Sequence, residues 1–203
     1  MKKKSVVVEH AFSSTDVKTP VGKLKIVMHG KDLAGITWPK DKRKFDWDKI
    51  KAIPESKESK TMALDIEKYF KTKKMKKKIW TSLVGTDLQL AVWKELLDIP
   101  FGATVSYSDL AKSLKRPKAV RAIASAIGKN PVSVLIPCHR VVGKDNTLTG
   151  FAGGLKAKKW LINWEAENNK AKAATETKTA KASKAKPAKA TKTPKTKSVA
   201  TTV

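Results

Sequence analysis

Cysteine is almost absent from this chain, which contains only Cys138 among its 203 residues. One cysteine cannot form an internal disulfide, and the three histidines, His10, His29 and His139, are too scattered to complete a zinc-binding pattern with it. We therefore expect neither a metal nor a cofactor. Any importance of Cys138 must lie in the reactivity of its thiol.

Long apolar runs and acidic side chains are also scarce. No segment approaches the length of a transmembrane helix, and the N-terminal MKKKSVVVEH lacks the apolar stretch and cleavage site of a signal peptide. These absences predict an intracellular protein, and we expect nucleic acid rather than a membrane as its partner. With 18 acidic against 44 basic residues, the formal net charge of +26 favours a polyanionic partner, nucleic acid first and an anionic membrane second.

The C-terminal residues 170–203 have an unusual composition, with ten lysines, one acidic residue and no aromatic residue. So few apolar side chains cannot bury enough surface to fold alone, so we expect a disordered basic tail. Removing its net charge of +9 leaves +17 on residues 1–169, so the preference for a polyanion does not depend on the tail. Such a tail favours the nucleus, with the cytoplasm of a prokaryote as the alternative.

The N-terminal part shows strand-like patterning. Apolar residues nearly alternate along residues 21–38 and are interrupted by a turn signal, Gly30, Lys31 and Asp32, which predicts a β-hairpin. A helix is expected near residues 61–71.

From Thr86 onward the spacing of apolar residues becomes helical, and Thr86 with Gln89 matches a capping box. A short helix is predicted over residues 106–114, and a second one begins at Pro117 and ends at Gly128. Two short helices separated by a tight turn indicate a helix-turn-helix.

The second of these helices has an apolar face and a polar face. The polar face comprises Lys118, Arg121, Ser125 and Lys129. Small side chains between them would let the backbone approach a nucleic-acid groove, although ordinary helix packing explains them equally well.

Residues 132–136, VSVLI, predict a buried strand that leads through Pro137 to Cys138. A thiol reacts as its thiolate, and His139 and Arg140 are the adjacent candidates for a base or a positive field. His139 could take the thiol proton directly only in a turn, and otherwise through a water. A buried structural cysteine remains the alternative explanation of this motif alone.

The wider sequence resembles the O6-alkylguanine-DNA alkyltransferases, also called methylated-DNA–protein-cysteine methyltransferases. The resemblance rests on PCHRVV, on KNPVSVLI and RPKAVRAIASAIGKNP before it and on TGFAGG after it, and it covers roughly residues 86–165. It implies an α+β protein with an N-terminal ribonuclease H-like α/β domain in residues 1–84. A C-terminal winged helix-turn-helix alkyltransferase domain would occupy residues 85–169, followed by the tail at 170–203.

The resemblance also implies an activity. A methyl or other alkyl group would pass from O6 of guanine, and from O4 of thymine, in double-stranded DNA to Cys138 in a single turnover, after the base is flipped out from the minor groove. His139 would act as the base through water, Glu165 would orient His139, Tyr107 would protonate the departing guanine, and Asn130 would brace the turn before the site. The protein would act as a monomer, with cooperative binding to DNA left open.

The remaining residues implied by the resemblance contact DNA or line the substrate pocket. Arg121 would fill the gap left by the flipped base. Further DNA contacts are expected from Lys118, Ala119, Ser125, Ser106 and Arg140. The pocket is expected to include Val141, whose carbonyl would read the guanine amino group, and Phe151, Ala152 and Gly153. Phe151 and Ala152 stand where many family members carry tyrosine and serine, which leaves the range of alkyl groups open.

Two other functions are compatible with parts of the pattern. A cysteine–histidine hydrolase would use the same thiol, but no separate histidine with an asparagine or aspartate is evident. A non-enzymatic DNA-binding protein would need the helix-turn-helix and tail alone. The joint presence of Cys138, His139, Tyr107 and Glu165 argues against it.

Overall fold

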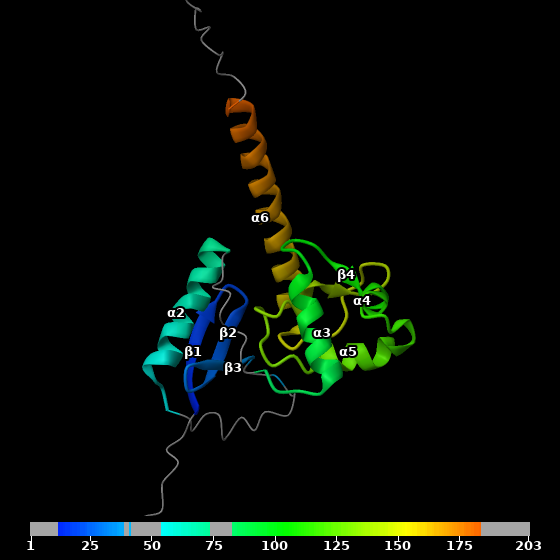
Figure 1. Cartoon of the computed structure of the whole chain (residues 1–203). Coiled ribbons are helices and arrows are strands. Elements are labelled where there is room, and N and C mark those ends of the chain that lie inside the picture. Colours follow the sequence, from blue (N-terminus) through cyan, green and yellow to red (C-terminus); the bar gives the residue numbers. More distant parts are fainter. Residues whose placement is uncertain (1–11, 39–40, 42–53, 74–82, 184–203) are drawn as a thin grey trace, which may run out of the picture.

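The computed structural model describes residues 12–38, 41, 54–73 and 83–183 (Figure 1). It is a mixed α/β structure in which a small antiparallel sheet and one helix precede a mainly helical C-terminal part. Within the described residues, no helix is both long and apolar enough to cross a bilayer.

The N-terminal sheet has three antiparallel strands in the order β1, β2, β3. They span Phe12–Thr19, Gly22–His29 and Asp32–Thr37. The predicted hairpin is confirmed as β2 and β3, which pair His29 with Asp32 across a tight turn. Gly30 adopts a φ of 58° in this turn, a left-handed conformation that glycine reaches without a Cβ penalty.

Helix α2 (Lys57–Thr72) packs against β1 and β2, and it includes the helix expected near residues 61–71. It starts earlier because Ser56 and Ser59 form a capping box, each side chain bonding to the other's backbone N–H. Its buried face carries Ile66, Tyr69 and Phe70.

The C-terminal part begins with α3 (Asp87–Asp98), whose predicted capping box is confirmed. Gln89 N donates to Thr86 Oγ1 at 3.4 Å, and Thr86 N donates to Gln89 Oε1 at 2.9 Å. Two short helices, α4 (Tyr107–Ser113) and α5 (Val120–Gly128), follow in the predicted positions. They are joined by the 3₁₀ turn η2 (Pro117–Ala119), and β4 (Val105–Ser106) pairs in parallel with β5 (Val141–Val142).

The strand expected over residues 132–136 is wrong. This segment is buried, but it forms only isolated bridges, from Val132 to Ile36 of β3 and from Ser133 to Ile136, around a turn in which Val134 has a φ of 76°. A continuous apolar run fits a buried turn as well as a strand, because both place every side chain in the core. Cys138 consequently begins the 3₁₀ turn η3 (Cys138–Arg140) and does not lie at a strand end.

The expectation of a disordered tail from Lys170 is also wrong as far as Ser183, because the last helix, α6 (Gly154–Ser183), continues through that segment. Composition predicted only that these residues cannot build a core. Alanine, lysine and glutamate are good helix formers, so a helix that starts in the folded part can propagate along them without burial. Residues 184–203 lie outside the described part of the chain.

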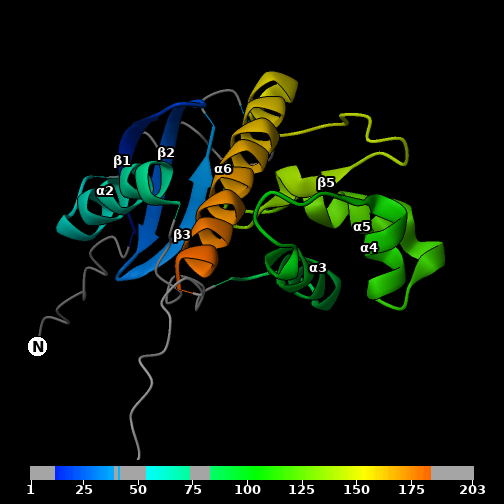
Figure 2. The ribbon, with the colours of Figure 1, turned by 90° about the horizontal axis from the view of Figure 1, so that it is seen from above.

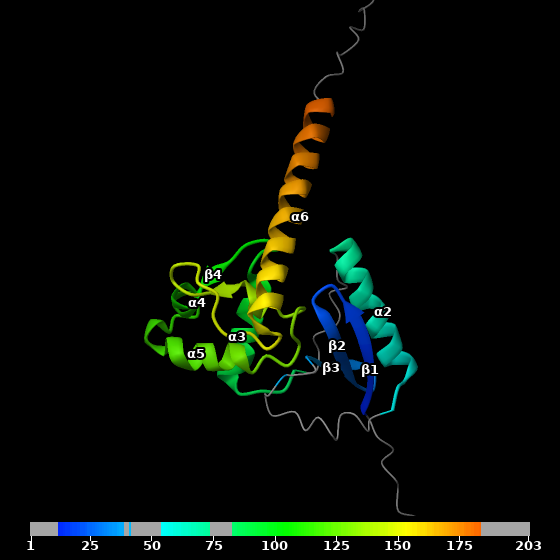
Figure 3. The same cartoon turned by 180° about the vertical axis from the view of Figure 1, so that it is seen from behind.

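Helix α6 starts between the N-terminal sheet and the C-terminal helices and extends away from both (Figures 1 and 3). Seen from above, α2 and the sheet lie on one side of it and α3, α4 and α5 on the other (Figure 2). Aromatic contacts join the two sides, with Phe70 of α2 at 5.5 Å from Trp164 and 6.2 Å from Trp160 of α6. Ile36 N of β3 also donates to Pro131 O at 2.9 Å, so both parts share one core.

Candidate active site around Cys138

Cys138 lies in the hydrophobic core, with 5% of its surface exposed. Its backbone N–H donates to Ile136 O at 2.8 Å, and this bond forms a tight turn just before the thiol. The turn η3 that follows places His139 and Arg140 in the interior as well. Three consecutive residues of the PCHRVV motif therefore face buried surroundings.

Asn130 holds the turn that precedes Cys138. Its Nδ2 donates to Ile136 O, and its Oδ1 accepts from Val132 N, both at 2.9 Å. The backbone adds a bond from Ile136 N to Val132 O at 3.0 Å. These bonds hold Val134 in the left-handed region, which is costly for a β-branched residue and persists only when its surroundings impose it.

His139 and Glu165 form a buried pair that connects the site to α6. His139 Nε2 lies 2.8 Å from Glu165 Oε1, and the two side chains are 0% and 1% exposed. When the carboxylate accepts from Nε2–H, the lone pair of the neutral ring lies on Nδ1. Nδ1 is buried and finds no hydrogen-bond partner among the described residues, so it is the nitrogen that can receive a proton.

Arg140 contacts the same carboxylate from the other side. Its Nε donates to Glu165 Oε2 at 2.8 Å, its Nη2 to Oε1 at 2.9 Å, and its Nη1 to Ile99 O at 2.6 Å. The guanidinium also lies over the Phe101 ring at 5.7 Å. All three guanidinium nitrogens are thus bonded inside the protein, and the expected contact of Arg140 with DNA stays a prediction.

These contacts set the proton affinities of the pair. Burial alone would raise the pKa of Glu165, but hydrogen bonds from His139 and Arg140 outweigh burial and hold that pKa at about 2. Burial lowers the pKa of His139, the Glu165 carboxylate opposes this, and the positive charges of Arg140 and Lys158 add to the lowering. The site thus contains an ionised carboxylate and a neutral histidine at neutral pH.

Lys158 of α6 is a buried residue that the sequence analysis missed. Its Nζ donates to Val141 O at 2.6 Å and to Thr149 O at 3.0 Å, and burial lowers its pKa. The Val141 carbonyl expected to read the guanine amino group is thus already bonded to an ammonium. A sequence signal exists, since Lys158, Leu161 and Glu165 share one buried face of α6 at helical spacing.

Tyr107 lies at the start of α4, where its hydroxyl accepts from Thr149 Oγ1 at 3.0 Å. It therefore meets the segment that carries the TGFAGG motif. Ser106, expected to contact DNA, is buried and caps α4: its Oγ accepts from Asp109 N at 3.0 Å and donates to Asp109 Oδ2 at 2.7 Å. This cap explains its presence without DNA.

Three of the expected DNA contacts do lie on the surface. Lys118 of η2 and Arg121 and Ser125 of α5 are exposed, while Ala119 is half-buried and packs against the core. The opposite face of α5 carries the buried Ile123 and Ile127, as the two-faced pattern predicted. Helix α5 therefore exposes a face that carries positive charge and small side chains to solvent.

The expected pocket residues 151–153 form the turn that leads into α6. Phe151 contacts His139, with ring centroids 6.4 Å apart, and Trp38 of the N-terminal part, with centroids 5.6 Å apart. Gly153 lies flat against the Trp38 indole: a Cβ at this position would come within 2.6 Å of the ring. The turn thus lies between the histidine and the N-terminal part.

The fold and this site together define a class: a mixed α/β protein that carries a buried cysteine beside a carboxylate-oriented histidine. Residues 87–167 match the family described as "6-O-methylguanine DNA methyltransferase, DNA binding domain". The methylated-DNA–protein-cysteine methyltransferase of Haemophilus influenzae is 38% identical over 158 residues, which cover 76% of this chain and 87% of that protein. The enzyme of the same name from Methanosarcina barkeri is 36% identical over 157 residues, covering 75% and 96%.

Solved structures agree with these relatives. The O6-methylguanine methyltransferase of Mycobacterium tuberculosis aligns with a TM-score of 0.67 and 31% identity, covering 77% of this chain and 93% of that one. A structure of the Mycobacterium tuberculosis protein OGT in complex with DNA gives the same TM-score at 32% identity, covering 76% and 93%. This chain belongs to the methylated-DNA–protein-cysteine methyltransferase family.

Proposed function

We propose that this chain repairs alkylated DNA by moving an alkyl group from O6 of guanine, and from O4 of thymine, to the sulfur of Cys138. The observation that carries the proposal is the buried His139–Glu165 pair directly after the cysteine, with Nδ1 of the histidine left to accept a proton. His139 takes the thiol proton through a bridging water. Glu165 stabilises the imidazolium that results.

The transfer is a single displacement. The thiolate sulfur of Cys138 bonds to the alkyl carbon, the bond from that carbon to O6 breaks, and its electron pair stays on the guanine. The base then gains a proton and leaves neutral, and we assign the donation of this proton to the Tyr107 hydroxyl. The product at Cys138 is a thioether, a poor leaving group, so each protein molecule reacts once.

The base must leave the helix to reach a buried sulfur. Flipping costs a few kcal/mol, and a side chain inserted into the stack can offset part of that cost. We assign this role to Arg121, approaching from the minor groove on the exposed face of α5. Lys118 and Ser125 on the same face would contact the phosphates or the groove, and the backbone at Ala119 would approach closely.

The finer architecture belongs to the same proposal. The pairing of β4 with β5 beside α4 and α5 supports a winged helix-turn-helix, and the antiparallel sheet covered by α2 supports a ribonuclease H-like N-terminal domain. A protein acting on DNA as a monomer is the simplest arrangement. The named relatives come from bacteria and archaea, which supports the cytoplasm of a prokaryote over the nucleus as its place of action.

The experiment that tests this function is a titration of the protein with a duplex containing O6-methylguanine. The amount of guanine restored should rise in proportion to the protein and stop at one equivalent, because the thioether cannot be cleared. Restoration beyond one equivalent would indicate a turning-over enzyme. No restoration would rule out the transferase.

A further inference from the structure

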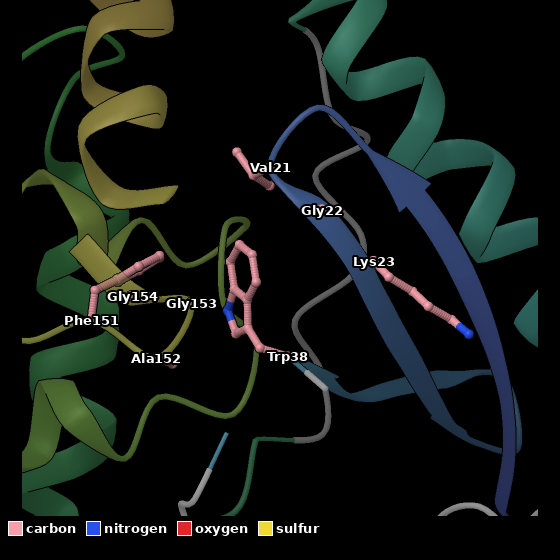
Figure 4. A pocket seen from close by; sticks show the side chains of 8 residues that line it. All are labelled: Val21, Gly22, Lys23, Trp38, Phe151, Ala152, Gly153 and Gly154. Carbon is pink, nitrogen blue, oxygen red and sulfur yellow. The ribbon is translucent and has the colours of Figure 1, made fainter. Parts of the chain in front are cut away.

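Two turns lie next to α6 close to the candidate site. The turn at residues 151–154 lies against Trp38 beside a cleft (Figure 4) and belongs to the expected substrate pocket. The turn at residues 99–102 joins α3 to β4 and meets α6 at Glu165. No step of the proposed transfer uses this second turn.

The second turn has a conformation that its own residues specify. Ile99 is extended, with a φ of −69° and a ψ of 119°, as a residue before proline usually is. Ala103 N donates to Pro100 O at 3.1 Å and closes the turn. Gly102 has a φ of 79°, the value that favours glycine at the third position of a type II turn. A proline followed two residues later by a glycine is therefore the sequence signal for this turn.

Three groups of this turn contact the buried Arg140 and Glu165. Ile99 O accepts from Arg140 Nη1 at 2.6 Å, and the Phe101 ring lies 5.7 Å from the guanidinium carbon. Gly102 N donates to Glu165 Oε2 at 3.1 Å. The turn therefore holds both members of this ion pair, one through a carbonyl and a ring and the other through a backbone N–H.

The Gly102 N–H is the fourth donor to the Glu165 carboxylate. Oε1 accepts from His139 Nε2 and from Arg140 Nη2, and Oε2 accepts from Arg140 Nε and from Gly102 N. Hydrogen bonds to an ionised carboxylate stabilise its negative charge. Each donor therefore reduces the share of that charge that acts on the other three groups.

No side chain fits at position 102. A Cβ there would lie 2.8 Å from Asn169 Cβ and 3.0 Å from Glu165 O, so the turn or α6 would have to move. Glycine thus meets two requirements at this position. It adopts the left-handed φ of the turn, and it allows the close approach that brings its N–H to the carboxylate.

We propose that Gly102 is a positioning residue for the transfer: its N–H fixes the Glu165 carboxylate and limits the negative charge that this carboxylate presents to His139. The inference rests on the proposed function and extends the site to the turn after α3. Gly102 acts through Glu165 and needs no contact with the cysteine or the DNA.

Other groups also act on the His139–Glu165 pair. Burial lowers the pKa of His139, the Glu165 carboxylate raises it, and nearby positive charges lower it further. The charged and titratable groups around the pair come from η3, α6 and α2 and are Cys138, Arg140, Lys158 and Tyr69. Loss of the Gly102 bond leaves all four in place and gives His139 more of the carboxylate charge. We therefore expect the pKa of His139 to rise when this bond is broken.

The first test follows the titration of His139 by NMR in the unreacted protein, which is practicable because the chain has three histidines. Gly102→Ala adds the Cβ that cannot fit. Gly30→Ala is the matched control, since its φ is also left-handed but nothing lies within 4 Å of the added Cβ. The His139 midpoint should move to higher pH in Gly102→Ala and stay in place in Gly30→Ala. An unchanged or lower midpoint in Gly102→Ala would overturn the inference.

A second measurement needs no variant, so it holds even if Gly102→Ala does not fold. In the unmodified protein the chemical shift of the Gly102 amide proton should change in step with the titration of His139, because both groups bond to one carboxylate. The Gly30 amide should not respond. A Gly102 amide that is silent while His139 titrates would also overturn the inference.

The same change should appear in the chemistry. On the acid side of the pH profile, single-turnover methyl transfer by Gly102→Ala should be slower by about two- to tenfold relative to its own plateau, the usual worth of one hydrogen bond. Gly30→Ala should keep the native profile, and a uniform loss of rate in Gly102→Ala would assign the turn a purely structural role. Both NMR measurements use protein without DNA, so they are independent of the proposed function. Absence of methyl transfer in the unmodified protein would overturn that function alone.

Discussion

Burial lowers the pKa of His139, and Glu165, which is shared between His139 and Arg140, opposes this lowering only in part. A carboxylate bonded only to the histidine would raise the pKa of that histidine strongly. The guanidinium draws part of that charge away and adds its own repulsion, so burial prevails and His139 stays neutral. Arg140 thus acts on the reaction through its neighbour.

Replacing Arg140 by methionine should therefore raise the pKa of His139. The rate of methyl transfer falls at low pH as the base becomes protonated, and this fall should begin at a higher pH in Arg140→Met than in the unmodified protein. Single-turnover rates from pH 5 to 9 measure the shift. Lys112→Met removes an exposed positive charge from α4 and is the matched control. A profile that drops uniformly without shifting would assign Arg140 a purely structural role.

The same residues predict how acid affects folding. The folded pKa of Glu165, about 2, lies below its ordinary 4.5, so its contribution to stability is complete above pH 4.5 and is lost as the pH falls toward 2. His139, with a pKa lowered from 6.5, adds stability that declines below pH 6.5. Both effects lower the free energy of unfolding in acid.

Glu165→Gln leaves Arg140 without its partner and should cost about 3 kcal/mol at pH 7. The difference from the unmodified protein should shrink below pH 4.5, where the native carboxylate begins to lose its advantage. Urea unfolding at several pH values checks this, with Glu167→Gln, an exposed neighbour on α6, as the control. A difference independent of pH would contradict the low pKa.

At the scale of elements, the sequence predicted the features that depend on neighbouring residues. It did not predict the features that depend on contacts between residues far apart in the chain. The capping box at Thr86 and Gln89 and the turn at Gly30 lie within a few residues, so the sequence displays them directly. The segment 132–136 forms a bridge from Val132 to Ile36, nearly a whole domain away in the chain, and the sequence gives no sign of this contact. The internal partners of Arg140 were missed for the same reason, because Glu165 and Ile99 reach it only through the fold.

Asn130 is the residue on which this turn depends, and its removal tests the element as a unit. Asn130→Ala leaves Val132 N without its partner, removes one of the two donors to Ile136 O and releases the strained Val134, so we expect a loss of about 2 kcal/mol in unfolding free energy. Methyl transfer should slow as well, because Cys138 comes directly after this turn and is positioned by it. Asn163→Ala, exposed on α6, should change neither quantity. Unchanged stability in Asn130→Ala would show that the backbone alone holds the turn.

At the scale of the whole molecule, the net charge of +26 governs how the protein meets DNA. Phosphate contacts release counterions, so affinity falls with salt in proportion to the number of contacts. Deleting residues 184–203 removes six lysines and no acidic residue. The truncated protein should bind DNA more weakly, with a shallower dependence of log affinity on log salt. Fluorescence anisotropy at several salt concentrations measures both, and an identical slope would show that these lysines do not contact DNA.

The central claim is that Cys138 accepts the alkyl group from DNA. Mass spectrometry of peptides from protein incubated with an O6-methylguanine duplex tests it most directly. We expect one added methyl group on the peptide that contains Cys138, with guanine restored in the DNA. Cys138→Ala should bind the duplex and gain no methyl group. An unmodified Cys138 in the native protein, or a methyl group on another residue, would contradict the account.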